Sequence, residues 1–147
     1  MEKKITDNKY NNYYCALKKV YELHLEYGFG KSPDIPSGFS ESLCRFLLNA
    51  SKGTDRTHDA ISADGKSIEI KATGTSEGKT TISNSNAFDK LVWIFIEFEK
   101  DIVNIYEMPR PVFSLLGGPG RKSISLGSIA KTNNINPTVY EFQLLAL

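Results

Sequence analysis

Asp59, Glu69 and Lys71 are three residues whose types and spacing could support metal-assisted chemistry. Two carboxylates can hold a hard divalent cation through their oxygens. Such a cation polarises a phosphate, stabilises the charge that grows on it and lowers the pKa of a bound water. A lysine beside the carboxylates can orient that water or stabilise charge in the transition state. If the three side chains converge, they suit hydrolysis of a phosphodiester bond.

Convergence depends on the hairpin that carries these residues. Asp64-Gly65 is a strong turn signal between two predicted strands, and alternation along the second strand puts Glu69 and Lys71 on one face. A two-residue loop at Asp64-Gly65 would pair Asp59 with the residue between Glu69 and Lys71, and would point Asp59 to the other face. A three-residue loop over 64–66, or a bulge beside it, pairs Asp59 with Lys71 instead. The chemistry therefore requires the longer loop or an equivalent bulge.

Two further groups could complete a metal site. The carbonyl of Ile70 lies between Glu69 and Lys71 along the chain, and Glu41 stands near the start of a predicted helix. Glu41 could reach the same cation, directly or through water, if that helix packs against the hairpin. It could equally favour a helix N-terminus and pair with Arg45 four residues later. Glu69 and Lys71 could likewise be a solvent-exposed strand face, with Asp59 a turn residue.

The elements that must position these residues form an α+β pattern. Apolar residues at helical spacing predict helices over 13–27, ended by Gly28, and over 39–50, capped by Ser37 or Ser40. The nearly continuous apolar run 91–99 predicts a central strand buried on both faces. Other strands are predicted over 58–63, 67–73, 102–108, 123–126 and 139–145, short helical turns over 110–116 and 128–131, and irregular structure over 51–57, 75–89 and 117–120. We expect one domain over 1–147, a mixed sheet flanked by helices.

Composition narrows the classes of protein. The 147 residues carry a net charge of only +1, yet no acidic residue lies between Glu107 and Glu141, so this tract could form either a positive face or an ordinary solvated surface. Cys15 and Cys44 are too few for a zinc site, and Cys44 lies in an apolar helical pattern typical of a buried thiol, which fits a reducing cytosol. The sequence has no glycine-rich phosphate loop, so we expect no nucleotide or other small-molecule cofactor. No apolar run is long enough to span a bilayer.

Asp59, separated by nine residues from Glu69-Ile70-Lys71, resembles the signature of the PD-(D/E)XK nucleases. Glu41 matches the helical glutamate of many members. His58 stands where the signature has proline, a departure that is common in the superfamily, and Pro33-Asp34 is too distant and set in a loop. The resemblance implies a restriction-endonuclease-like core, with Asp59, Glu69, Glu41 and the Ile70 carbonyl as metal ligands and with Lys71 as a catalytic residue.

A wider resemblance points to one branch of that superfamily. Residues 38–43 (GFSESL), 65–72 (GKSIEIKA) and 121–126 (RKSISL) are similar to small type II restriction endonucleases that recognise GCNGC. This resemblance implies a homodimer in a prokaryotic cytoplasm that cuts double-stranded DNA with a stagger at a short palindrome. It also implies Mg²⁺ as the cofactor, with Mn²⁺ able to substitute. The alternatives are another nuclease of the superfamily, such as a junction resolvase or a repair nickase, and a non-catalytic DNA-binding relative.

Basic and amide side chains are the candidates for DNA contact. Arginine and lysine suit guanine, and asparagine suits adenine, although most such residues contact phosphates or are plain surface. The candidates are Arg45, Arg56, Lys79, Asn84, Asn86, Arg110, Arg121 and Lys122. We favour the segment 73–86 and Arg121-Lys122 for sequence recognition, because the first directly follows the catalytic strand.

Overall fold

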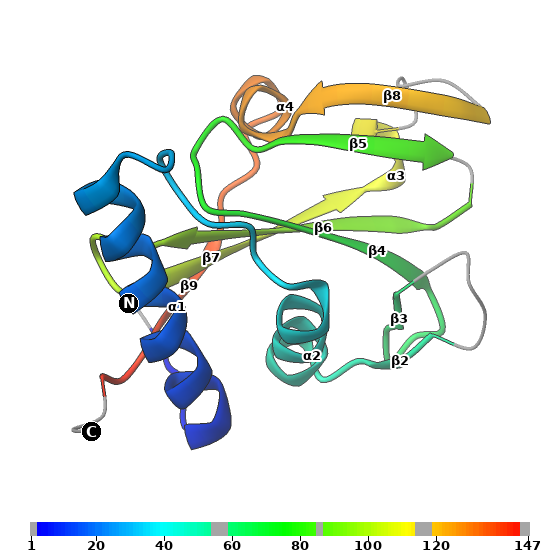
Figure 1. Ribbon diagram of the computed structural model, residues 1–147. Helices are drawn as coiled ribbons and strands as arrows, with labels where there is room; N and C mark the ends of the chain where they lie inside the picture. The colour runs from blue at the N-terminus through cyan, green and yellow to red at the C-terminus, as the bar shows by residue number, and fades with distance from the viewer. Residues whose placement is uncertain (1–2, 54–58, 85–86, 114–118, 145–147) are drawn as a thin grey trace.

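The computed structural model describes residues 3–53, 59–84, 87–113 and 119–144, without the side chains of 83, 84, 111, 113 and 119–122. A main sheet has the strand order β1-β9-β7-β6-β4-β3-β2, and β5 and β8 form a second, two-stranded sheet (Figure 1). The elements are β1 (Lys3–Lys4), α1 (Asn8–Tyr27), α2 (Ser37–Leu48), β2 (Ser51–Lys52), β3 (Ala60–Ile61), β4 (Ser67–Thr73), β5 (Lys79–Asn84), β6 (Lys90–Glu97), β7 (Ile102–Pro109), α3 (Arg110–Phe113), β8 (Pro119–Ser125), α4 (Leu126–Thr132) and β9 (Thr138–Glu141). The predicted mixed sheet flanked by helices is confirmed.

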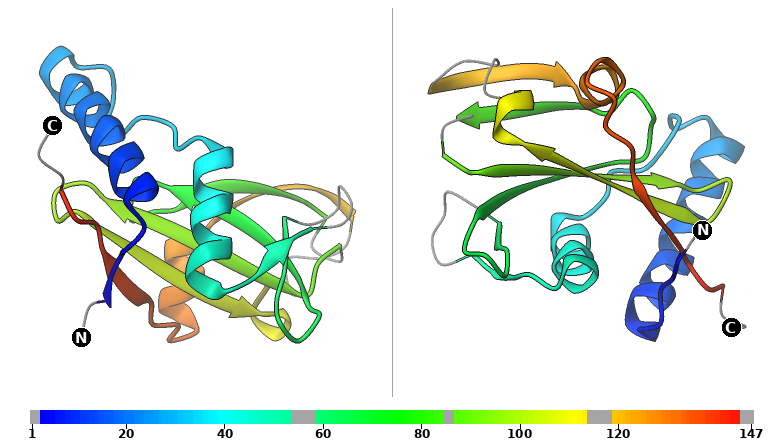
Figure 2. Two further views of the ribbon diagram at one scale, coloured as in Figure 1. Left: turned by 90° about the horizontal axis from the view of Figure 1, so that it is seen from below. Right: turned by 180° about the vertical axis from the view of Figure 1, so that it is seen from behind.

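The main sheet is covered on both faces. Helices α1 and α2 lie against one face, and the β5–β8 sheet with α4 lies against the other (Figures 1 and 2). Strand β6 separates the two layers, since Val92, Ile94 and Ile96 pack with the α1–α2 core while Leu91 and Trp93 pack with the β5–β8 core. The central strand predicted over 91–99 is therefore confirmed, because only a strand buried on both faces needs an unbroken apolar run.

Helix α1 ends where the sequence predicts but begins earlier. Gly28 adopts φ 71°, the left-handed conformation that ends a helix, and its amide bonds the carbonyl of His24. At the other end, Asp7 accepts a hydrogen bond from the backbone N–H of Lys9, so the helix starts at residue 8 instead of residue 13. The extra turn is held by tertiary contacts, because the buried Asn11 donates to the carbonyl of Ile5. A local apolar period cannot reveal such a contact.

Helix α2 covers residues 37–48, two residues earlier than predicted, and its predicted cap is wrong. Pro36 occupies the N-cap position and makes no side-chain hydrogen bond. Ser40 instead donates to the carbonyl of Ser37. The expected buried thiol is confirmed, since Cys44 is fully buried and burial raises its pKa to about 12.

Strands β2 and β5 are the main elements that the sequence pattern missed, and the predicted strand 123–126 covers only the end of β8. Strand β5 lies in the polar segment 75–89, and β8 begins at Pro119, inside the predicted loop 117–120. The two strands pair antiparallel, with Thr80 opposite Ile124 and Thr81 opposite Ser123. Their pairing joins segments some forty residues apart, so their hydrogen bonds leave no local signature. Strand β3 is also shorter than the predicted strand 58–63. Within the described residues, no helix is long and apolar enough to cross a membrane.

Candidate active site

The hairpin between β3 and β4 has the three-residue loop that the chemistry requires, placed one residue earlier than predicted. Ser62 N–H donates to the Lys66 carbonyl at 2.9 Å, so the loop consists of residues 63–65. Gly65 adopts φ 85°, which a three-residue hairpin loop needs at that position. Ala60 lies opposite Ile68, and the Asp59 N–H bonds the carbonyl of the same Ile68, so regular pairing of the two strands stops at Ala60. The Asp59 carboxylate bonds the N–H of Ile70 instead, so the predicted pairing of Asp59 with Lys71 is wrong.

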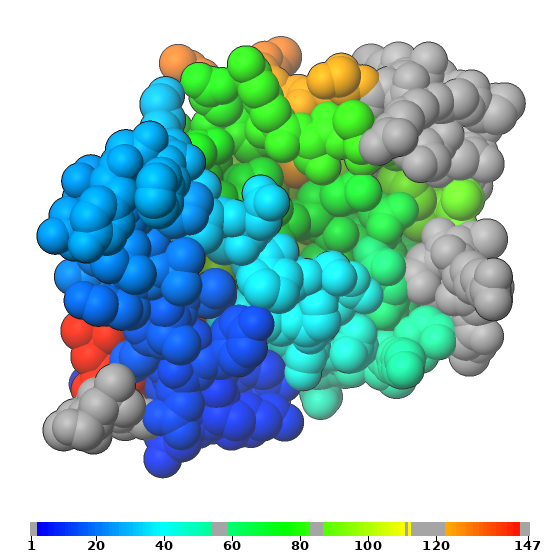
Figure 3. Space-filling model, in the orientation of Figure 1, coloured from blue at the N-terminus to red at the C-terminus, as the bar shows by residue number. Residues whose placement is uncertain are grey.

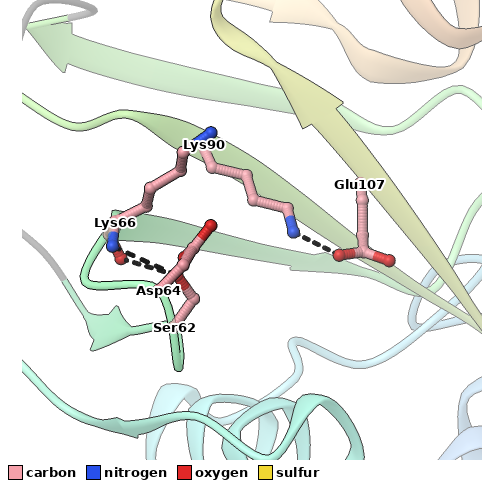
Figure 4. A network of polar contacts seen from close by, with 5 residues as sticks. All are labelled: Ser62, Asp64, Lys66, Lys90 and Glu107. Atoms are coloured by element: carbon pink, nitrogen blue, oxygen red, sulfur yellow. Dashed lines mark hydrogen bonds and ion pairs between the residues drawn. The ribbon is translucent and has the colours of Figure 1, made fainter.

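The loop is held by Ser62, as Figure 4 shows. The Ser62 hydroxyl accepts the backbone N–H of Lys66 at 3.2 Å and donates to the Asp64 carboxylate. This hydrogen bond lowers the pKa of Asp64. Nearby, the ammonium of Lys90 pairs with Glu107 across β6 and β7, next to the start of β4 (Figure 4). The loop is thus fixed in length, and with it the face on which Asp59 lies.

Asp59 lies immediately before β3 and forms hydrogen bonds across to β4. Its N–H donates to the Ile68 carbonyl at 2.8 Å, and its carboxylate accepts the N–H of Ile70 at 2.8 Å. Beyond Ile68, no strand among the described residues pairs with that edge of β4, and the Asp59 carboxylate takes the place of a strand carbonyl. Because a strand residue points its N–H and C=O to the same side, the Ile70 carbonyl also faces this open edge. Asp59 is thereby brought beside Glu69.

Ile70 and four predicted residues with charged side chains line one cleft of about 260 Å³. Glu41 comes from the first turns of α2, Asp59 from the hairpin, and Glu69 and Lys71 from β4. The cleft lies where the N-terminal end of α2 meets the open edge of β4, on the face that Figure 3 shows with α2 in cyan and β4 and β5 in green. Its other lining residues are Ile35, Ser37, Ser40, Ala72 and Thr80.

The three carboxyl groups repel one another strongly. Burial, a hydrogen bond from its proton to Asp59 and the charges of Asp59 and Glu41 together raise the pKa of Glu69 to about 8, against the opposing effect of Lys71. Burial also raises the pKa of Glu41, with the charge of Asp59 acting in the same direction and Arg45 and Lys71 opposing it. Near neutral pH, the metal-free site therefore keeps a proton on Glu69 that a bound cation would displace.

This donor set fits a hard divalent cation such as Mg²⁺. Carboxylates from three different elements and a backbone carbonyl meet in one half-buried cleft, and a cation would relieve their repulsion. Among the described residues, no three His, Cys, Asp or Glu side chains are already arranged as a metal cage. Mg²⁺ does not need one, since it keeps several waters and commonly uses one or two carboxylates with the phosphates of a substrate.

Of the other predicted residues, Arg45 contacts a residue that lines the cleft. Its Nη1 donates to the carbonyl of Asp59 at 3.4 Å, so it holds the Asp59 backbone. Lys79, at the start of β5, is exposed and lies 3.4 Å from Glu77. Arg110 is at the start of α3, where it donates to the Phe88 carbonyl.

The remaining candidates are placed by their backbone alone or not at all. Asn84 lies in β5, and Arg121 and Lys122 lie in β8, so the two segments favoured for recognition form one ribbon, with Ile82 opposite Lys122. Arg56, His58 and Asn86 lie outside the described residues. Sequence reasoning missed Ser37, Ser40 and Thr80 as cleft residues. Ser40 stood in a segment that carries the family resemblance, but no local pattern singled out Thr80.

Comparison with known families gives one match. The model of the family described as Bsp6I restriction endonuclease matches residues 2–113, a range that includes Glu41, Asp59, Glu69 and Lys71. No curated protein matches the chain.

Proposed function

We propose, from the premise that this chain belongs to the Bsp6I restriction endonuclease family, that Asp59, Glu69 and Lys71 form the catalytic core with which it cuts DNA. As a member of that family, the chain is a type II site-specific deoxyribonuclease that acts on double-stranded DNA. Membership of the family favours a restriction endonuclease over a resolvase, a nickase or a non-catalytic relative. The observation that carries the proposal is the hydrogen bond from Ile70 N–H to Asp59, which keeps the three groups in one cleft.

The proposed cofactor is Mg²⁺, with Mn²⁺ able to substitute. Asp59, Glu69 and the Ile70 carbonyl would hold the ion, with Glu41 joining directly or through water. When bound, the ion supplies a Lewis acid that polarises the scissile phosphate and makes water more acidic. The proton on Glu69 leaves the site as the ion enters, since the carboxylate must be ionised to bind it. This donor set supports the proposed membership of the PD-(D/E)XK superfamily.

Lys71 acts on the phosphate and the water. Its ammonium lies on the same face of β4 as Glu69, as alternation along a strand requires. There it can orient the attacking water and stabilise the negative charge that develops on the phosphate oxygens.

The β5–β8 ribbon is the proposed reader of the DNA sequence. A two-stranded ribbon fits the major groove, and Thr80 of β5 lines the catalytic cleft, so the ribbon adjoins the strand being cut. Lys79, Asn84, Arg121 and Lys122 are the proposed contacts, with guanine as the target of the basic residues. The proposed site is GCNGC. A palindrome cut on both strands requires two catalytic sets, so the proposed enzyme is a homodimer in a prokaryotic cytoplasm.

Plasmid cleavage tests the proposal. Asp59→Ala, Glu69→Ala and Lys71→Ala are each expected to reduce the cleavage rate by roughly a thousandfold or more, while circular dichroism shows an unchanged fold. The matched control is Asp34→Ala, which removes the exposed aspartate of the other Pro-Asp dipeptide and should cut like the parent. EDTA should stop cleavage and Mg²⁺ should restore it, and sequencing the ends identifies the site. Full activity in the three variants would refute the catalytic assignment.

A further inference from the structure

Helix α1 carries two apolar faces, of which one is buried in the core and the other is largely exposed among the described residues. Tyr10, Tyr14 and Leu17 are buried in the α1–α2 core. A second set, which we call the α1 seam, recurs at alternating steps of three and four residues. The α1 seam consists of Tyr13, Ala16, Val20, Leu23 and Tyr27. Tyr13, Val20 and Tyr27 are 43%, 41% and 61% exposed, although a solvent-facing helix surface is ordinarily polar.

The spacing of the α1 seam is that of the a and d positions of a heptad repeat, which pack against another helix. Within the described residues, Tyr13 at one end of the seam stacks on Phe39 of α2, with ring centroids 4.6 Å apart. Figure 2 shows α1 along the outer margin of the molecule. The seam is aromatic and aliphatic, so it suits a protein surface better than a phosphate backbone.

We propose that the α1 seam pairs antiparallel with the same seam of a second copy of this chain. The inference rests on the homodimer of the proposed function and names the surface that forms it. In one register, Ala16 lies opposite the second copy's Tyr27 and Val20 lies opposite the second copy's Leu23. Two-fold symmetry repeats both contacts, so each small side chain meets a large one. The two copies therefore form a closed dimer through the same surface on each.

Charges beside the α1 seam select the same register. Lys19 and Glu26 are exposed, stand one heptad apart and flank the seam on the same side. In an antiparallel pair, residues at this flanking position meet one another across the interface. The register that puts Ala16 opposite the second copy's Tyr27 also puts Lys19 opposite the second copy's Glu26, twice by symmetry. The surface is therefore complementary to itself in both shape and charge.

Charge exchange tests the pairing by sedimentation of the full chain. Lys19→Glu or Glu26→Lys alone brings like charges together at two symmetric places, and should raise the dimer dissociation constant on the order of tenfold. The double variant Lys19→Glu/Glu26→Lys restores opposite charges and should return the constant to that of the parent. The matched control is Glu22→Lys, which changes the charge of α1 away from the seam and should leave the dimer intact. Val20→Glu should yield monomers.

The outcomes separate this inference from the catalytic proposal. Glu69→Ala should remain dimeric while inactive, so loss of cleavage in that variant says nothing against the seam. A parent that sediments as a monomer while cutting both strands would overturn the inference. So would a dimer that is unaffected by Lys19→Glu, Glu26→Lys and Val20→Glu, because the copies would then meet elsewhere. Failure of the double variant to recover would overturn the register.

Discussion

Replacing Glu69 by Gln is expected to stabilise the metal-free enzyme while abolishing cleavage. Burial beside Asp59 raises the pKa of Glu69 to about 8, so an ionised carboxylate at this position is unfavourable in the folded chain. Glutamine resembles the protonated acid, because its amide can still donate to Asp59, and it never ionises. A group that carries the proposed chemistry is thus a source of instability when no cation is present.

The size of the effect follows from the two pKa values. Below pH 4.5, both the folded and the unfolded chain hold the Glu69 proton, and the residue costs nothing. Between pH 4.5 and about 8, the unfolded chain releases that proton while the folded chain keeps it, so stability falls as pH rises. At about 1.36 kcal/mol per pH unit, the upper limit is about 5 kcal/mol at high pH. The side chain is partly exposed to solvent, which screens the charge and reduces this to roughly 2 kcal/mol.

Urea unfolding in EDTA, followed by the fluorescence of the single tryptophan Trp93, measures the difference. The variant should gain little over the parent near pH 5.5 and most near pH 8.5. Added Mg²⁺ should stabilise the parent more than the variant, because the variant has lost a carboxylate ligand. Glu22→Gln, on the surface of α1, is the control and should show no such trend. A gain that is absent near pH 8.5, or is constant with pH, would refute the reasoning.

Two other substitutions test the supports of the site. Arg45→Met removes the hydrogen bond to the Asp59 carbonyl and should slow cleavage roughly tenfold, with DNA affinity in Ca²⁺ unchanged; a loss of affinity instead would make Arg45 a DNA contact. Gly78 adopts φ 62°, and a Cβ there would lie 2.7 Å from the ring of Trp93, so Gly78→Ala should cost roughly 2 kcal/mol or more. Thermal unfolding measures this against Gly38→Ala, which has open space and should be close to neutral; equal melting temperatures would contradict the argument.

Elements whose burial follows a local period could be predicted from the sequence. Strand β4 covers residues 67–73 as predicted, since isoleucines alternate with polar residues along it. Strand β6 was recognisable because apolar residues fill both of its faces. The end of α1 was marked by Gly28, whose left-handed conformation suits a residue without a side chain.

Elements that depend on distant partners could not be predicted in this way. Among the side chains of β5 that the structure describes, Ile82 is the buried one and the others are polar, and the strand character of β5 comes from pairing with β8. The first turn of α1 depends on Asn11, which also accepts the backbone N–H of Gln143 near the other end of the described chain. Such contacts stabilise the element only when the two segments pair, so the sequence of either segment alone does not predict it.

The sequence by itself determined the chemical groups of the candidate site and put Glu69 and Lys71 on one face, because residues two apart in a strand always share a face. Only the tertiary structure decided that Asp59 joins them and that Glu41 reaches the same cleft. Asp59 depends on whether the hairpin loop has two residues or three, a choice that reverses its face. Glu41 depends on how the end of α2 packs against the edge of β4, and such packing is set by the whole core.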